Sequence, residues 1–397
     1  MVTDSASLGR PFWTFWSAAA LANVGDGIRL AAFPLLAVSL TANPVSVAAV
    51  TAAQALPWLV TGLLAGALAD RRGARTLLVW ADTARVLVLA VLVVAVATGR
   101  ASVPLVLVAS FVLGVGETVR DTAAQTAVPS LVPERLLERA NARLVAGEVV
   151  GNEFVGPPVG AVLFAVGAAL PFAANGASLA LATMLVLTLP VSLAARPAAP
   201  ATNTNPGVVA GLRWLGRHRL LRALTAVTAA VAAADSAWFA VLVLYADSQL
   251  GAGTVGFGML LAVGALGGLL GSFITDRLVD GRRHRAVLTW SVAVTAGIPA
   301  LLAVTSRLWA AMLVIVVTSG SFAVLNITAA SLRQRTVPRE LLGRVVAAGR
   351  TLTFSAAAVG ALLGGALTKL AGVEAPFLLS GLVAAVATTA WWTASRP

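Results

Sequence analysis

The sequence has no cysteine, only two histidines and a single lysine among its 397 residues. Without cysteine, a disulfide bond, thiol catalysis and a thiolate metal site are all excluded. His218 and His284 both lie in basic loops, so the apolar segments contain no imidazole. No glycine-rich loop precedes Lys369, which excludes the phosphate-binding loop of ATPases. Because the apolar segments offer neither a hydrolytic triad nor a metal cluster, we expect no enzyme activity and no cofactor.

Charged residues are scarce as well. They make up 11% of the chain, and 59% of the residues are hydrophobic, whereas an average soluble domain carries about 25% charged residues. Apolar stretches of about 20 residues recur, each long enough to cross the ~30 Å hydrocarbon core of a bilayer. The sequence therefore predicts an all-α polytopic membrane protein in a lipid bilayer. Twelve spans are expected, at 12–38, 44–69, 76–98, 102–122, 142–166, 171–192, 222–246, 254–276, 285–305, 308–330, 345–369 and 374–394.

The formal net charge of +12 is unevenly placed. Most arginines fall in loops on one side of the predicted membrane; those on the other side or within spans are Arg29, Arg85, Arg100, Arg120, Arg307 and Arg350, and Lys369 is also on the other side. Positive loops stay cytoplasmic, so we expect a multi-pass protein of the bacterial inner (plasma) membrane with both termini inside. A basic inner face suits an anionic leaflet, and we expect no nucleic-acid partner.

The longest loop divides the predicted spans into two sets of six. Residues 196–206 have no apolar periodicity, which is typical of a flexible linker. After them, apolar residues alternate with arginines up to residue 221, which predicts a short basic amphipathic helix at the membrane surface. We therefore predict an N-terminal six-helix bundle (1–192), a cytoplasmic linker with an amphipathic helix (193–221) and a C-terminal six-helix bundle (222–397).

The two halves resemble each other. Gly66–Asp70 ends the second span and Gly271–Asp276 ends the eighth, and an arginine follows each aspartate. Two pseudo-symmetric six-helix bundles joined by a central loop are a transporter architecture, with the substrate site between the halves near the middle of the membrane.

Glycines four residues apart occur in the second, fifth, eighth and eleventh spans. Such spacing lines one helix face with glycine and lets two backbones approach closely in lipid. We interpret these faces as seams on which helices move past one another. The pairs are Gly62/Gly66, Gly147/Gly151, Gly156/Gly160, Gly264/Gly268, Gly267/Gly271 and Gly360/Gly364.

Residues 66–75 read Gly-Ala-Leu-Ala-Asp-Arg-Arg-Gly-Ala-Arg. This segment resembles the loop signature of the major facilitator superfamily, and the span layout fits that family over the full length. The resemblance implies the major facilitator fold and a cluster that closes the cytoplasmic gate. Ordinary topogenic charges are the alternative, but they leave the glycines unexplained. The gating residues expected on this basis are Gly66, Asp70, Arg71, Gly73 and Arg75, with Asp276 as the counterpart in the second half.

Arg350 lies in the inner third of the eleventh span. It could pair with Asp70 or with a substrate anion, and we count it among the gating residues. The alternative is an arginine whose long side chain reaches the membrane surface without any such role.

The fifth span carries a second resemblance. Gly147 and the run Gly156-Pro157-Pro158-Val159-Gly160 are similar to the signature of drug–proton antiporters within the superfamily. Two positions depart from it: Ala161 replaces a glycine, and Asn152 stands where a glycine is usual, with Gly151 one residue early. Residues 129–141 with Gly156-Pro157 also resemble the branch of macrolide-efflux proteins and siderophore exporters. A merely bent, tightly packed helix is the alternative.

Charges inside predicted spans are the candidates for substrate and proton coupling, because each costs at least ~2.5–3.5 kcal/mol on insertion scales. Asp26 and Arg29 are three residues apart on one face of the first span and can pair. Asp235, in the seventh span, lies at a similar depth, and these two spans are equivalent in the two halves. We therefore take Asp26 and Asp235 as the leading candidates for the central cavity.

The fourth and fifth spans carry a second group of charges: Glu117, Arg120, Asp121, Glu148, Asn152 and Glu153. We expect the face of Glu117 and Asp121 to meet the face of Glu148 and Asn152, with Arg120 or Arg143 neutralising one acid. A carboxylate that moves between water and apolar surroundings can couple proton entry to substrate exit. A static ion-pair network that fixes helix register is the alternative.

These features together predict a secondary active antiporter that exports a lipophilic or amphiphilic small molecule, such as a drug, antibiotic or siderophore, in exchange for protons. Sodium could use the same carboxylates. An importer or uniporter of a nutrient is the alternative on the same fold. A receptor or a membrane enzyme is disfavoured, because no large soluble domain and no catalytic cluster is present. We expect a monomer.

Overall fold

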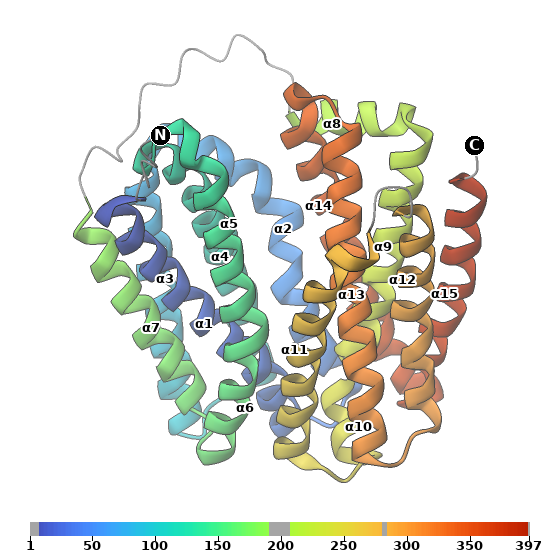
Figure 1. Ribbon diagram of the computed structural model, residues 1–397. Helices are drawn as coiled ribbons and strands as arrows, with labels where there is room; N and C mark the ends of the chain where they lie inside the picture. Colours follow the sequence, from blue (N-terminus) through green and yellow to red (C-terminus); the bar gives the residue numbers. More distant parts are fainter. Residues whose placement is uncertain (1–7, 190–206, 280–283, 396–397) are drawn as a thin grey trace. The chain divides into compact units, whose positions relative to one another are not determined.

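A computed structural model describes residues 8–189, 207–279 and 284–395. Within these ranges the side chains at 59–71, 134, 138, 207–210, 212, 276, 339–340, 342–344 and 347 are outside the description. The described chain is helical and has no strand (Figure 1). Its α-helices are α1 (Gly9–Leu40), α2 (Pro44–Arg72), α3 (Ala74–Ala97), α4 (Val103–Leu131), α5 (Leu137–Val149), α6 (Gly156–Val166), α7 (Leu170–Leu187), α8 (Gly207–Arg217), α9 (Arg219–Phe239), α10 (Leu242–Ser248), α11 (Gly253–Leu278), α12 (His284–Gly297), α13 (Leu308–Thr336), α14 (Arg339–Ala371) and α15 (Ala375–Ala394).

Each predicted span falls on one helix or on a continuous helical run. The fifth span is α5 and α6 joined by a π-helical segment (Val150–Val155), the seventh is α9 and α10, and the ninth is α12 followed by a 3₁₀ segment (Ile298–Val304). Within the described residues, 11 helical stretches are long and apolar enough to cross a membrane. The all-α polytopic fold class is therefore confirmed.

The chain packs as two compact units. The first comprises residues 1–33 and 60–202, and the second comprises residues 34–59 and 203–397. The end of α1 and the first half of α2 thus pack with the second unit, where Ala48 and Ala52 bury their methyl groups against Ala240 and Ala361. The predicted division into an N-terminal bundle (1–192), a linker (193–221) and a C-terminal bundle (222–397) stays a prediction.

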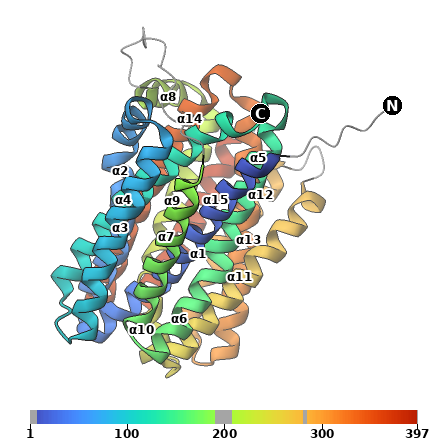
Figure 2. The ribbon, with the colours of Figure 1, turned by 90° about the vertical axis from the view of Figure 1, so that its left-hand side faces the viewer.

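In the first unit, α3 lies against both α4 and α7 (Figures 1 and 2). In the second, α9 packs between α14 and α15, and α11 packs on α13. The amphipathic helix α8 does not lie free: Leu215 is 4% exposed and belongs to the apolar core that α9, α12 and α15 share. Arg213 and Arg217 on the same helix are exposed.

The predicted close approach at the glycine pairs is confirmed in three spans. A Cβ added at Gly151 would lie 2.9 Å from the Cβ of Asn23 in α1. At Gly267 it would lie 2.8 Å from the Cα of Val316 in α13, and at Gly364 2.8 Å from the Cα of Ala237 in α9. The side chains around Gly62 and Gly66 lie outside the described residues.

Each of these three seams joins helices of the same unit. The interpretation of these faces as seams on which helices move past one another stays a prediction. The space beside each of these glycines is filled by a partner helix of the same unit. The glycines bring two backbones together in lipid, where small residues allow the closest packing.

Candidate functional site

Six charged side chains from three helices form one connected network in the first unit. All but Glu117 are at most 4% exposed, and Glu117 is 20% exposed. Each helix supplies one acid and one arginine, so the network carries no net formal charge. The members are Asp26 and Arg29 on α1, Asp82 and Arg85 on α3, and Glu117 and Arg120 on α4.

The contacts run in a chain. Arg29 donates to Glu117 at 2.5 Å and lies 3.6 Å from Asp26. Asp26 accepts from Arg85, which in turn lies 3.6 Å from Asp82. Oδ2 of Asp82 accepts from Nε of Arg120 at 3.2 Å, and the Arg120 guanidinium also donates to the backbone carbonyl of Ala18 at 3.2 Å. Because buried charges are tolerable only when paired and hydrogen-bonded, this network fixes the register of α1, α3 and α4.

The predicted pair between Asp26 and Arg29 is confirmed. Arg120, one of the two arginines expected to neutralise an acid of the fourth or fifth span, makes its ion pair with Asp82 of the third span, and Glu117 pairs with Arg29. Arg120 also acts electrostatically on Asp121 of the fourth span. Asp82 and Arg85 were missed as site residues. The signal was present, because they repeat in the third span the three-residue Asp–Arg spacing of Asp26 and Arg29.

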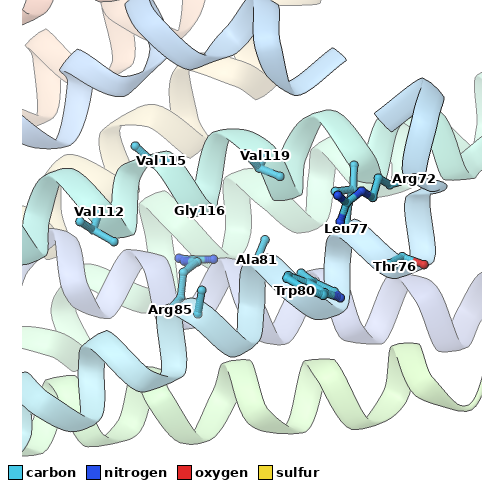
Figure 3. Close-up of a pocket in the computed structure, with 11 residues that line it drawn as sticks. Arg72, Thr76, Leu77, Trp80, Ala81, Arg85, Val112, Val115, Gly116 and Val119 are labelled. Atoms are coloured by element: carbon cyan, nitrogen blue, oxygen red, sulfur yellow. The ribbon is translucent and has the colours of Figure 1, made fainter. Parts of the chain in front are cut away.

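Gly116 in α4 makes room for Arg85. A Cβ at Gly116 would lie 2.7 Å from Cδ of Arg85, so the absence of a side chain lets the arginine stem pass and reach Asp26 on α1. Figure 3 shows Arg85 and Gly116 on facing helices, beside a pocket of about 260 Å³ between α3 and α4. Trp80 and Val112 line the same pocket and are exposed. The lining is mostly apolar, which suits lipid contact.

Three further acids of the first unit, Asp121, Glu148 and Glu153, make no ion pair with the described side chains. Asp121 is half-buried, and Glu148 and Glu153 are exposed within a candidate membrane span. Glu148 acts electrostatically on both Asp121 and Glu153. The π segment accounts for the second of these interactions, because it adds one residue to a helical turn and so brings Glu153, five residues after Glu148, to the same side of the helix. Arg143, the other expected partner, makes no ion pair within the described chain.

The same π segment explains where this sequence departs from the antiporter signature. The glycines of the fifth span are spaced four, five and four residues apart, and the five-residue step from Gly151 to Gly156 coincides with the π turn. Gly156 donates its N–H to the carbonyl of Gly151, and the next residue, Pro157, has no N–H to offer. The extra residue therefore keeps all four glycines on the face toward α1. They are Gly147 against Trp16, Gly151 against Asn23, Gly156 against Gly27 and Gly160 against Ile28.

Asn152 is half-buried in this turn. Its backbone carbonyl faces α1, since a Cβ at Gly27 would lie 2.8 Å from it. The antiporter-like residues Gly156, Pro157 and Gly160 are themselves buried. The fifth span is thus tied to the helix that carries Asp26.

Asp235 on α9 belongs to the second unit and is half-buried. It makes no ion pair or hydrogen bond with any side chain that the structure describes. One helical turn further on, the indole N–H of Trp238 is buried and also without a partner in the described chain. The two leading candidates therefore differ: Asp26 is neutralised by arginines, and Asp235 is not.

Of the expected gating residues, the side chains of Asp70, Arg71 and Asp276 and the surroundings of Gly66 lie outside the described residues. Gly73 has φ 79° at the start of α3, a conformation that favours glycine. Arg75 donates to the carbonyl of Leu187 at 2.6 Å and so ties the start of α3 to the end of α7.

Arg350 is exposed, and its guanidinium lies 5.8 Å from the centre of the Trp58 ring. Trp58 in turn stacks on Phe354, with ring centres 4.9 Å apart. All three residues belong to the second unit. A cation over an aromatic face is favourable, so this contact holds the arginine in place.

The comparisons with known proteins point to transport. A family model described as transmembrane secretion effector matches residues 7–395. The multidrug efflux pump Tap of Mycolicibacterium fortuitum is 29% identical in an alignment of 383 positions, and the match covers 92% of this chain and 91% of Tap. Two solved structures share the fold. A mutant of the nucleoside transporter NupG has a TM-score of 0.80 at 12% identity, over 98% of this chain and 100% of that one. A bacterial homologue of the iron transporter ferroportin, in an inward-facing state, has a TM-score of 0.76 at 17% identity, again over 98% and 100%.

Proposed function

Because the chain belongs to the transmembrane secretion effector family of the major facilitator superfamily, it is a membrane transporter and not an enzyme, and we propose that it is a proton-coupled exporter. The cargo is a lipophilic or amphiphilic small molecule such as a drug, antibiotic or siderophore. The observation that carries this proposal is the likeness to an efflux pump along almost the whole of both chains.

The pairing of charged residues supports different roles for the two units. The ion-pair network of the first unit is balanced, so Asp26 is paired with arginines and three helices are held in register. Asp235 makes no ion pair with any side chain that the structure describes. A lone carboxylate inside a membrane span is costly unless it meets water or binds a proton. Asp235 is therefore our candidate for the carrier of the coupling proton, and Asp121, Glu148 and Glu153 are candidates for its counterpart in the first unit.

Alternating access would arise as two six-helix bundles rock around a central cavity, driven by protons moving inward. The gate residues Gly66, Asp70, Arg71, Gly73, Arg75, Asp276 and Arg350 would close the cytoplasmic side. In this proposal the protein is a monomer of the inner (plasma) membrane with both termini in the cytoplasm, as its basic loops suggest.

The test uses inverted membrane vesicles from an efflux-deficient host, in which the cytoplasmic face points outward. A panel of lipophilic dyes and antibiotics is offered outside, and the vesicle interior is acidified. We expect accumulation that an uncoupler abolishes and that Asp235→Asn removes. The matched control is Asp247→Asn, which changes an exposed aspartate at the end of α10 and should leave accumulation unchanged.

An importer on the same fold predicts the opposite outcome. Cargo would then fail to accumulate in inverted vesicles and would accumulate in right-side-out vesicles under an inward proton gradient. That result would replace export by import and would leave the family assignment untouched.

A further inference from the structure

Three arginines and a histidine converge at one end of the second unit, where α9 begins, whereas Asp235 lies near the other end of that helix. A pocket of about 320 Å³ there is lined by Arg217, His218 and Arg219, by Arg285, and by Ala394 and Ser395. These residues come from the end of α8, the starts of α9 and α12, and the end of α15. No acid lines the pocket, and the three arginines make no ion pair with the described side chains.

The walls of the pocket are held in place by hydrogen bonds. Arg222 donates to the carbonyl of Gly216 at 2.9 Å, which fixes the turn between α8 and α9. The ring of His218 stacks on Trp214 with centres 5.3 Å apart, and its Nδ1 accepts the N–H of Leu221. On the other side, the buried Trp391 of α15 donates to the carbonyl of Arg285 at 3.3 Å. These contacts hold the backbone from which the three arginine side chains extend.

Two helices also begin at this pocket. α9 starts at Arg219 and has 21 residues, and α12 starts at His284 and has 14 residues. The N–H groups of a helix N-terminus favour an anion. Nδ1 of His218 accepts the N–H of Leu221, so Nε2 is the ring nitrogen that can donate to a ligand. The arginine forks match the oxygen geometry of a phosphate.

The depth of the pocket identifies the source of the phosphate. Candidate membrane spans begin at Arg219 and His284 and end at Ala394. This shared end of the three spans lies at the depth of lipid headgroups. Leu220 and Ala394 give the pocket an apolar side that the first part of an acyl chain can contact. We propose that this pocket binds the phosphate of an anionic phospholipid and so anchors the helix α8, at the end of the linker, to the membrane.

The test is lipid retention by the purified full-length protein, read by native mass spectrometry. Phosphatidylglycerol is offered together with phosphatidylcholine. We expect the protein to retain phosphatidylglycerol selectively, and the triple variant Arg217→Gln/Arg219→Gln/Arg285→Gln to bind it about 100-fold more weakly, since each arginine near the surface contributes about one kilocalorie per mole. A triple change of the same residues to lysine keeps the charge and should restore most of the binding.

The matched control is Arg135→Gln/Arg139→Gln/Arg213→Gln, which lowers the net charge equally at three exposed arginines outside the pocket. It should retain the lipid. Equal loss in both glutamine variants would mean that only the general basic charge matters, and would overturn the site. Inorganic phosphate that displaces phosphatidylglycerol at equal concentration would overturn the lipid assignment. Binding by the lysine variant shows that loss in the glutamine variant is not misfolding. No step depends on transport, so the outcome is independent of the proposed function.

Discussion

Removing Arg85 should destabilise the first unit strongly, because it leaves a buried charge without its main partner. Arg85 is 1% exposed and is the donor to Asp26, whose other cation, Arg29, lies 3.6 Å away. Arg85→Met keeps much of the side-chain volume and removes the charge. Breaking a buried pair from one side costs about 3–5 kcal/mol. Asp26→Asn leaves the opposite excess charge on Arg85 and should cost a similar amount.

The double variant Asp26→Asn/Arg85→Met should be more stable than the sum of the two losses predicts. It leaves the pairs Arg29–Glu117 and Asp82–Arg120, so the network is neutral again. We expect a coupling free energy of about 2 kcal/mol, within the range measured for residues in one network. The assay is equilibrium unfolding in mixed detergent micelles with increasing dodecyl sulfate, followed by far-ultraviolet circular dichroism.

Asp26→Asn combined with Arg143→Met provides the control for this cycle. Arg143 is exposed and makes no ion pair in the described chain, so the two changes should add. If the losses from Asp26→Asn and Arg85→Met also add within about 0.5 kcal/mol, the two residues are not coupled and the network described above is wrong.

Three further predictions concern helix seams and the gate. Gly364→Ala should lower the midpoint of thermal unfolding, because its Cβ would lie 2.8 Å from Cα of Ala237. Gly349→Ala on the same helix has open space around the new methyl group and should raise the midpoint slightly. Equal shifts in the two variants would exclude a tight α9–α14 seam. Deletion of Asn152 should leave a folded protein by size-exclusion chromatography, since a straight α-helix would then space the four glycines of the fifth span four residues apart. Deletion of Ala146 rotates all that follows by about 100° and should prevent folding. Tolerance of both deletions would contradict the π-turn register. Arg350→Gln should lose the contact with Trp58 and alter tryptophan fluorescence, which Arg335→Gln, at an exposed arginine, should not do.

Much of this fold could be predicted from the sequence, because the spans are set by a one-dimensional property. Twenty apolar residues in a row must cross the bilayer as a helix, and a glycine every fourth residue must meet another backbone. The pair Asp26–Arg29 could be predicted for the same reason, since residues three apart on a helix are always neighbours.

Pairings between helices could not be predicted in this way. Arg120 reaches Asp82 and Arg85 reaches Asp26 because of how α1, α3 and α4 are rotated about their axes, and composition does not fix that rotation. The π turn is an intermediate case. The early glycine at Gly151 departs visibly from the antiporter signature, but its meaning depends on knowing that the opposite face belongs to α1.

The most direct test of proton-coupled export is a measurement of proton flux in proteoliposomes that contain only the purified chain. A pH-sensitive dye is trapped inside, no pH gradient is imposed at the start, and a cargo identified in the vesicle screen is added to the outside. The account predicts proton movement opposite to the cargo in wild type and in Asp247→Asn, and none in Asp235→Asn although cargo still binds. Cargo-driven proton flux of normal size in Asp235→Asn, or cargo flux with no proton movement in wild type, would contradict it.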